Sequence, residues 1–489
     1  MLHKRTAYPL FVVGTTILAT QAVASPLIPG SLLEAAAKKA TASFPKLSYR
    51  QAGSSAAQAF FAQGQAPTPA PAAQAPTSRA LPDPYPSPPF PLSDWVTDET
   101  TPIGESWDAP TGPLQKALVG DSWDKSRIKF YGWFDAGYTA STSKHSDLPV
   151  SYDLYPNHPV VDQFIFKVER MPDTVQTDHI DWGFRTTSLF GIDYRFTAAD
   201  GYFYDQLQKR NALYGYDPVE LWGQIYFPKI AEGSVVTVGR YISPPDIEAQ
   251  LAPENYLYSH SLMFTVDPYT YTGISALTRL SKYWSIVTGI TAGNDTSPWE
   301  KSGELEGELL LGWHSHSNYD SLWFGTDAIG DGHFAYGHDN MNLGSITWGH
   351  KYSSLWHMQT QMYYLWEYDA AKGGSEIDGP NEPWSNGGGA GPIIPGQSHA
   401  WGYVNYLEYL VDKKSYMSFR TDWLGDPDGW RTGVDNDYMS VTLGYAHYFT
   451  PTTEIRPELR YDFAKERPGY DLDTRKAQWT LGGDIIFHF

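Results

Sequence analysis

Apolar and polar residues alternate along most of the chain after residue 125. In Glu454–Phe463 the odd positions carry apolar or aromatic side chains, and every even position carries a charge. In Gln478–Phe489 the odd positions again hold most of the apolar side chains. A period of two places successive side chains on opposite faces of a β-strand. These segments therefore predict strands that have one apolar and one polar face.

The same alternation recurs in 16 or 17 segments between residues 126 and 489, depending on whether the weakest are counted. Besides the two above, the clearer ones are Ile128–Tyr138, Asp162–Val168, Ile180–Phe184, Ile192–Phe196, Val219–Phe227, Val235–Tyr241, Tyr271–Leu277, Trp284–Ile290, Leu355–Tyr368, Trp401–Tyr409, Tyr416–Trp423 and Val441–Phe449, and the weaker ones are Glu308–His316, Ser321–Asp327 and Gly344–His350. Single-chain bacterial barrels have an even number of antiparallel strands, so we predict an all-β fold, a transmembrane antiparallel β-barrel of about 16 strands, with 14 or 18 as alternatives. A barrel of this size leaves an aqueous channel.

The charged face of Glu454–Phe463 suits a wall between lipid and a water-filled lumen. Two alternatives explain this strand alone: a sandwich that exposes the charges to solvent, or an edge strand, which would account for Pro457. Recurrence of the pattern over many strands favours the barrel. The predicted lumen-lining residues are Arg185, Asp193, Arg195, Arg240, Arg420, Asp422, Glu454, Arg456, Glu458, Arg460 and Asp462.

Connecting segments of unequal length fit the same architecture, which has short turns on one side of the membrane and longer loops on the other. Lys372–Ser398 is rich in Gly and Pro and is typical of a surface loop, and Ala198–Asp217 is polar and rich in Tyr. Pro244–Thr270 is a long insertion. It is a candidate for a loop that folds into the lumen and narrows the pore.

The first 125 residues differ in character from the rest. Residues 1–24 combine a short positive region, an apolar region and Ala22-Val23-Ala24, which together predict a cleaved secretory signal; the apolar region is too short for a membrane anchor. Residues 25–125 hold 16 of the 36 prolines and long Ala runs, which predict disorder or polyproline II. We expect a periplasmic linker, either a passive tether or a segment that meets the cell wall, followed by an outer-membrane barrel over residues 126–489.

Composition excludes several classes. The net charge of −20 disfavours nucleic-acid binding, which needs a basic surface. The absence of cysteine excludes disulfides and Cys-ligated zinc, and no apolar run after the first 25 residues is long enough for a membrane helix. The 18 Trp, 34 Tyr and 22 Phe are scattered over the strands. This placement favours aromatic girdles at the membrane interfaces over sugar-stacking platforms in a cleft.

Several motifs resemble the OmpL-like β-barrel porin family of bacterial outer membranes. They are Phe130–Asp135 (FYGWFD), Glu169–Asp173 (ERMPD), Trp182–Arg185, Gly191–Phe196, Gln224–Pro228, Val238–Tyr241 (VGRY), Ala252–Tyr256 (APENY), Tyr258–Ser261 and Thr272–Ile274. The chain departs from the family pattern at Pro244–Glu248, which reads PPDIE where PIGxE is expected. The resemblance implies an outer-membrane channel, and it supplies neither a substrate nor catalytic residues.

No motif for a nucleophile, a paired-carboxylate site or a phosphate loop stands out, so we expect no enzyme activity and no cofactor. His314 and His316 are more simply explained by lumen polarity or chance than by a metal site. The predicted function is a porin-type channel for passive diffusion of small polar solutes; the alternatives are a barrel enzyme such as a lipid hydrolase, or a non-conducting surface-binding barrel.

The expected partners are outer-membrane lipid, the barrel-assembly machinery, the solutes themselves and, in a homo-oligomer, further copies of the chain. We expect the C-terminal strand to carry the assembly signal. Its residues are Trp479, Leu481, Ile485, Phe487 and Phe489.

Overall fold

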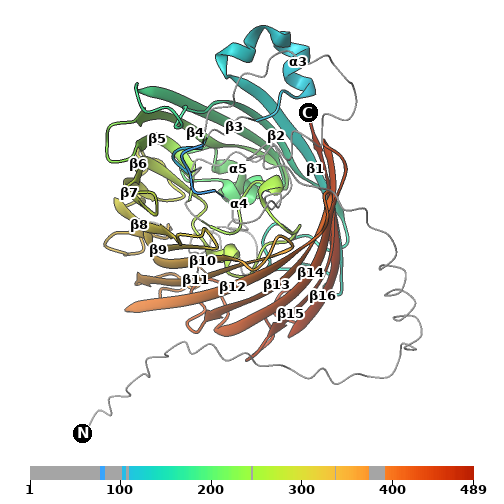
Figure 1. Cartoon of the computed structure of the whole chain (residues 1–489). Coiled ribbons are helices and arrows are strands. Elements are labelled where there is room, and N and C mark those ends of the chain that lie inside the picture. The colour runs from blue at the N-terminus through green and yellow to red at the C-terminus, as the bar shows by residue number, and fades with distance from the viewer. Residues whose placement is uncertain (1–77, 83–101, 106–108, 244–245, 336–337, 374–390) are drawn as a thin grey trace. The chain divides into compact units, whose positions relative to one another are not determined.

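The computed structural model describes residues 78–82, 102–105, 109–243, 246–335, 338–373 and 391–489. The expected signal peptide and most of the expected linker lie outside these residues. Within them, strands β1 to β16 form one closed antiparallel barrel in which each strand pairs with its neighbours in sequence and β1 pairs with β16 (Figure 1). The prediction of a 16-stranded antiparallel barrel is confirmed.

Every predicted strand except Ile192–Phe196 corresponds to a strand of the barrel. The strands are β1 (Lys129–Ser141), β2 (Pro159–Arg170), β3 (Asp181–Gly191), β4 (Gly215–Phe227), β5 (Ser234–Ile242), β6 (Thr270–Arg279), β7 (Trp284–Asn294), β8 (Glu306–His314), β9 (Asp320–Ile329), β10 (Asn342–Lys351), β11 (Trp356–Tyr368), β12 (Gln397–Asp412), β13 (Ser415–Asp426), β14 (Asn436–Thr450), β15 (Thr453–Ala464) and β16 (Ala477–His488). The short helices are α3 (Pro113–Val119), η2 (Gly120–Ser126), α4 (Tyr194–Thr197), α5 (Asp205–Gln208), η3 (Ala252–Glu254) and η4 (Phe264–Val266).

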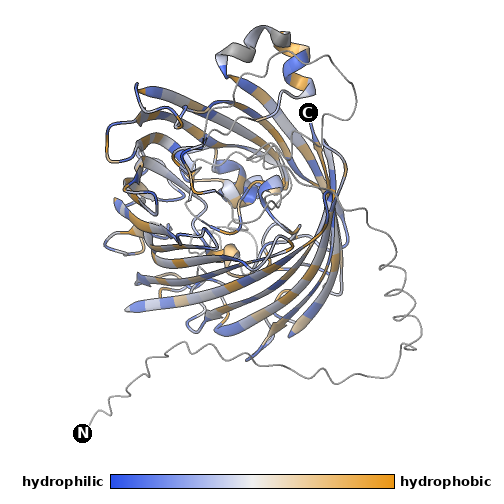
Figure 2. Cartoon of the chain, in the orientation of Figure 1, coloured by the Kyte–Doolittle hydropathy of each residue, from blue (hydrophilic) through white to orange (hydrophobic). Residues whose placement is uncertain are grey.

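The strands alternate in exposure as they alternate in polarity. In β14, Met439, Val441 and Leu443 are exposed, whereas Ser440 and Thr442 between them are buried. Figure 2 shows the same alternation of hydrophobic and hydrophilic residues along the strands. Large apolar surfaces are rare on soluble monomers. An apolar outer face around a polar inner face is the arrangement that lipid requires of a barrel wall.

Among the described residues, no helix is both long and apolar enough to cross a lipid bilayer.

Pro457 lies in the interior of the sheet, because a closed barrel has no edge strand. It stands opposite Gly483 of β16. A proline cannot donate to a neighbouring strand, so it is normally confined to sheet edges or bulges. The alternative of an edge strand at this position is therefore wrong.

The connections alternate between short and long, which defines two ends of the barrel. Two residues join β12 to β13 and β14 to β15, whereas residues 142–158, 192–214 and 243–269 join β1 to β2, β3 to β4 and β5 to β6. Because β1–β2 is a long connection, β1 starts and β16 finishes at the end with the short turns. We call the two ends the short-turn end and the long-loop end.

Two pieces of the expected linker are fixed to the short-turn end of the barrel. Ile103 is buried against Tyr226, and the Arg79 Nε donates to the backbone oxygen of Val175 at 2.8 Å. Arg279 at the end of β6 donates to the backbone oxygens of both Ile103 and Arg79, each at 2.8 Å. At these points the linker is part of the folded barrel rather than a passive tether.

Candidate functional site

The segment between β5 and β6 lies inside the barrel. Its backbone N–H at Ile247 donates to Gln361 of β11 at 3.3 Å, and its Glu254 pairs with Lys167 of β2 at 3.6 Å. A segment that contacts such distant strands of a closed barrel must pass through the interior. We call residues 246–269 the insertion; the prediction that this loop folds into the lumen is confirmed.

Apolar side chains of the insertion pack against glycines of the wall. A Cβ on Gly444 would lie 2.1 Å from Leu257 Cδ2, and one on Gly402 would lie 2.3 Å from Met263 Cγ. Leu257 and Met263 belong to a buried cluster with wall residues such as Tyr406 and Leu424. The glycines thus leave the space in which the insertion sits.

Gly444→Val should therefore loosen the insertion. The new side chain would occupy the space of Leu257, and overpacking of this kind costs about 1–3 kcal/mol. Gly223→Val is the matched control, because Gly223 faces outward and its nearest contact to a new Cβ is a backbone oxygen at 4.0 Å. The midpoint of urea unfolding in lipid vesicles should fall for Gly444→Val only. Equal midpoints for the two variants would contradict this packing.

A cluster of rings ties the insertion to the loop between β1 and β2. The His260 ring packs on both Tyr152 and Phe264, with ring centroids 4.0 and 4.7 Å away, and those two rings also contact each other at 5.8 Å. Burial lowers the pKa of His260 to about 3, so its ring is neutral at physiological pH. The ring nitrogen Nε2 lies 2.9 Å from the backbone oxygen of Ala249, the geometry of a donated hydrogen bond.

Arg456 of β15 anchors the start of the insertion. It forms an ion pair with Asp484 of β16 and donates to the backbone oxygens of Ala252 and Asn255 at 2.6 and 3.0 Å. One guanidinium therefore binds a neighbouring strand and the insertion together.

Arg420 and Arg460 anchor the middle of the insertion. Arg420 pairs with Asp422 at 3.2 Å and Arg460 with Asp462 at 2.7 Å. Both guanidinium groups also donate to Ser259 Oγ, at 3.0 and 3.2 Å. The insertion covers these charges, which are buried.

The acidic residues of the same wall receive backbone donors from the insertion. Glu458 accepts from the N–H of Ser259 at 3.0 Å, and Asp422 accepts from the N–H of Leu262 at 2.8 Å. Glu454 is buried nearby. Ion pairs and the backbone of the insertion, rather than lumen water alone, therefore contact this charged row.

Arg185 and Arg240 are neutralised within the wall itself. Arg185 pairs with Glu169 and Glu220, both at 2.8 Å, and Arg240 pairs with Asp217 at 2.7 Å. The partners Glu169 and Asp217 were not predicted as lumen residues. The pairing register of β2 and β3 could have indicated Glu169, because this residue stands directly opposite Arg185 on the adjacent strand.

Asp193 and Arg195 do not lie on a strand. The predicted strand Ile192–Phe196 is instead a turn after β3 followed by most of α4, with Asp193 accepting from Gln163 at 2.9 Å. The chain leaves the sheet at Gly191, whose φ of +154° is unfavourable for other residues. Arg195 donates to the backbone oxygen of Ala212 at 3.0 Å. Both residues belong to the loop that covers the long-loop end.

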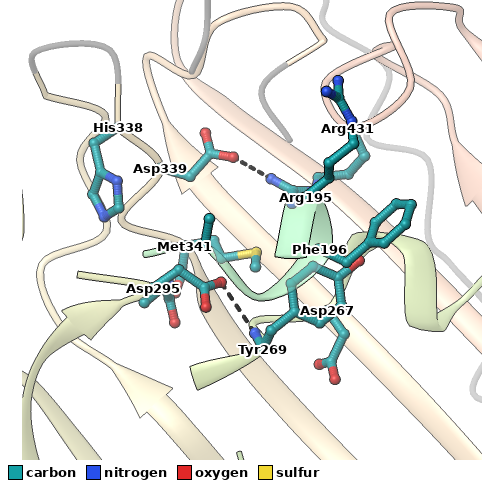
Figure 3. Close-up of a pocket in the computed structure, with 11 residues that line it drawn as sticks. Arg195, Phe196, Asp267, Tyr269, Asp295, His338, Asp339, Met341 and Arg431 are labelled. Atoms are coloured by element: carbon teal, nitrogen blue, oxygen red, sulfur yellow. Dashed lines mark hydrogen bonds and ion pairs between the residues drawn. The ribbon is translucent and has the colours of Figure 1, made fainter. Parts of the chain in front are cut away.

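A small cavity of about 30 Å³ remains toward the long-loop end. Charged residues of the insertion and of the long loops line it, including Asp267, Arg431 and Asp339 (Figure 3). Arg431 and Asp339 form an ion pair at 2.5 Å, and Asp295 accepts from the N–H of Tyr269 at 3.0 Å. The cavity has room for about two water molecules.

The inner wall is less covered toward the short-turn end. Thr347 and Lys351 of β10 and His357 and Gln359 of β11 share the inward positions of their strands and are partly exposed. Gln361 and Tyr363, further along β11, are buried. Water therefore reaches this part of the interior from the short-turn end.

The histidine pair considered from the sequence does not share a strand face. His314 is the last residue of β8, and His316 lies in the following turn, with its ring centroid 4.1 Å from that of Tyr283. The described residues contain no group of three or more His, Asp or Glu side chains suited to a metal.

The expected assembly-signal residues lie at the seam of the barrel. Trp479, Leu481 and Phe487 are exposed on the outer face of β16. Ile485 is partly exposed, and Phe489 exchanges backbone hydrogen bonds with Gly132 of β1. Recognition by the assembly machinery stays a prediction.

The family model described as "Putative beta-barrel porin-2, OmpL-like" matches residues 127–489. The chain belongs to this family. As an OmpL-like porin-2 barrel it is an outer-membrane β-barrel of the porin type, and the predicted family is confirmed.

Solved structures resemble the porin-2 barrel in fold. They include an anion-selective porin from Comamonas acidovorans (11% identity, TM-score 0.47, covering 74% of this chain and 99% of that one). OmpT, an outer membrane protein of Vibrio cholerae, is 10% identical with a TM-score of 0.43, covering 74% and 97%. The outer membrane channel DcaP of Acinetobacter baumannii is 7% identical with a TM-score of 0.43, covering 74% and 97%. A search of curated proteins found no match.

Proposed function

We propose that the protein is a channel for passive diffusion of small polar solutes across the bacterial outer membrane. The observation that carries the proposal is a closed 16-stranded barrel whose inner wall is polar and partly exposed near the short-turn end. The insertion packs in one buried cluster with residues of β4 to β6 and β9 to β15, and the inner wall of β10 and β11 stays partly exposed near the short-turn end. We place the solute route where the insertion meets the wall.

The short-turn end faces the periplasm in this proposal. Outer-membrane barrels have short periplasmic turns and longer extracellular loops. The linker pieces at Arg79 and Ile103 contact the short-turn end, which is where an exported N-terminal segment would remain. Residues 1–24 supply the export signal.

Planar-bilayer recording tests the channel directly. The purified full-length barrel should give stepwise openings of reproducible size. Boiled and unboiled samples compared on gels check that the barrel is folded and report any homo-oligomer. A folded barrel that never opens would overturn the proposal.

Such a silent barrel would favour the non-conducting alternative. The packing of the insertion against a large part of the wall is the observation on its side. A hydrolase would have to show activity on lipid in the same preparation.

A further inference from the structure

The chain passes through the line of the barrel wall just before β1. Ala109 is buried on the inner side, in one cluster with Tyr131 of β1 and Ile486 of β16. Trp123 of η2 packs instead against Phe130, which points outward on β1, with ring centroids 5.5 Å apart. The chain between Ala109 and Trp123, which includes α3, therefore leads from the inner side of the wall to its outer side.

Gln115 of α3 fixes the crossing point at the seam of the barrel. β1 starts at Lys129, but its pairing with the C-terminal end of the chain begins only at Gly132, so the first backbone groups of β1 have no strand on that side. Gln115 is buried, and its Oε1 accepts from the N–H of Phe130 at 3.3 Å. Its Nε2 donates to the backbone oxygen of Ile128 at 3.4 Å. α3 thus continues the wall beyond the end of β16.

The part of α3 that faces away from β1 has an apolar side. Leu114 and Leu118 are four residues apart and share one side of the helix. Leu118 is 57% exposed, and Trp123 in the following η2 is 39% exposed. Lys116 is also exposed, but it lies two residues from Leu118 and so projects from the opposite side. The segment is therefore amphipathic.

This apolar side is continuous with the lipid-facing surface of the barrel. Trp123 already contacts that surface through the outward ring of β1. Arg127, which follows η2, pairs with Asp181 at the start of β3 at 2.9 Å. The neighbours of Asp181 are Ile180 and Trp182, which are 61% and 53% exposed. Exposed apolar side chains thus reach the short-turn edge of the wall beside α3, and tryptophan is enriched at the depth of the lipid headgroups.

We propose that residues 113–126 form an interfacial anchor that binds membrane lipid at the short-turn end. Leu118 and Trp123 contact the boundary between headgroups and acyl chains, and Lys116 stays on the aqueous side. An amphipathic segment binds a bilayer surface in this way, with its apolar side at the acyl boundary and its charged side in the headgroups. The anchor holds the crossing point of the chain at the membrane surface. It goes beyond the proposed channel function.

Site-directed spin labelling tests the anchor, because the chain has no cysteine of its own. Single nitroxide labels on Leu118→Cys and Lys116→Cys are compared in barrels reconstituted in phospholipid vesicles. Oxygen, which concentrates in lipid, should relax the Leu118→Cys label several-fold more strongly than a water-soluble nickel complex does. The Lys116→Cys label should show the reverse preference. Leu443→Cys is the reference for lipid contact, because Leu443 is exposed on the outer face of β14.

Gel mobility of unboiled samples shows whether each labelled barrel is folded, and Trp123→Cys gives a second, independent measurement on η2. Equal access of the nickel complex to the Leu118→Cys and Lys116→Cys labels would overturn the proposal, because α3 would then lie in water. A Leu118→Cys label that is shielded from both oxygen and nickel would also overturn it, because protein rather than lipid would cover the helix. These results are the same whether or not the barrel conducts.

Discussion

Replacing residues 247–266 with a short Gly-Ser linker is expected to raise single-channel conductance several-fold. The ends of β5 and β6 are adjacent in the barrel, so a short connection can join them. An unobstructed barrel of about 16 strands encloses a wide aqueous channel. The insertion fills part of that space, where its buried residues form one cluster with residues of β4 to β6 and β9 to β15.

The deletion variant exposes charges that the insertion now covers, so its folding must be checked first by heat-modifiable gel mobility. Gly444→Val tests the rise in conductance independently, because it disturbs the packing of the insertion against the wall without shortening the chain. A folded deletion variant with wild-type conductance would mean that the insertion does not limit the current.

Arg420→Ala is expected to destabilise the barrel by about 3–5 kcal/mol, because it leaves buried carboxylates without their partner. Arg420 contacts Asp422 in its own strand and Glu248 in the insertion, each at 3.2 Å. The free energy of unfolding in lipid vesicles, measured from urea titrations, gives the effect.

Arg467→Ala is the control for the loss of one arginine. Its ion pair with Asp435 at 2.8 Å is largely exposed, with side-chain exposures of 56% and 38%. Exposed pairs of this kind contribute about 0–1 kcal/mol. If the two variants lost similar amounts, the anchoring role of Arg420 would be refuted.

Alternation predicted all 16 strands because the lipid and the interior impose opposite demands on neighbouring residues. The pattern in Glu454–Phe463, for example, corresponds to β15 from end to end. Alternation reports that one face is polar, but not whether water or protein covers it. That is why Arg456 and Arg460 were placed in an open lumen, although the insertion more than a hundred residues earlier in the chain covers them.

The site was less predictable than the fold for a related reason. Ile192–Phe196 alternates over only five residues, and so short a run does not distinguish a strand from a loop that buries Tyr194 and Phe196. The contacts of the insertion join it to strands as distant as β2 and β11. Such a grouping depends on tertiary contacts that local sequence does not carry.

The seam of the barrel has a consequence for the order of assembly. Trp133 of β1 stands opposite His488 of β16, and Arg456 of β15 holds an insertion that leaves the wall after β5. Contacts between residues so distant in sequence form late, because the chain loses loop entropy before it gains them. Closure of the wall and seating of the insertion therefore both wait for the last two strands. An intermediate that lacks β15 and β16 has an open sheet and an insertion without its Arg456 and Arg460 anchors.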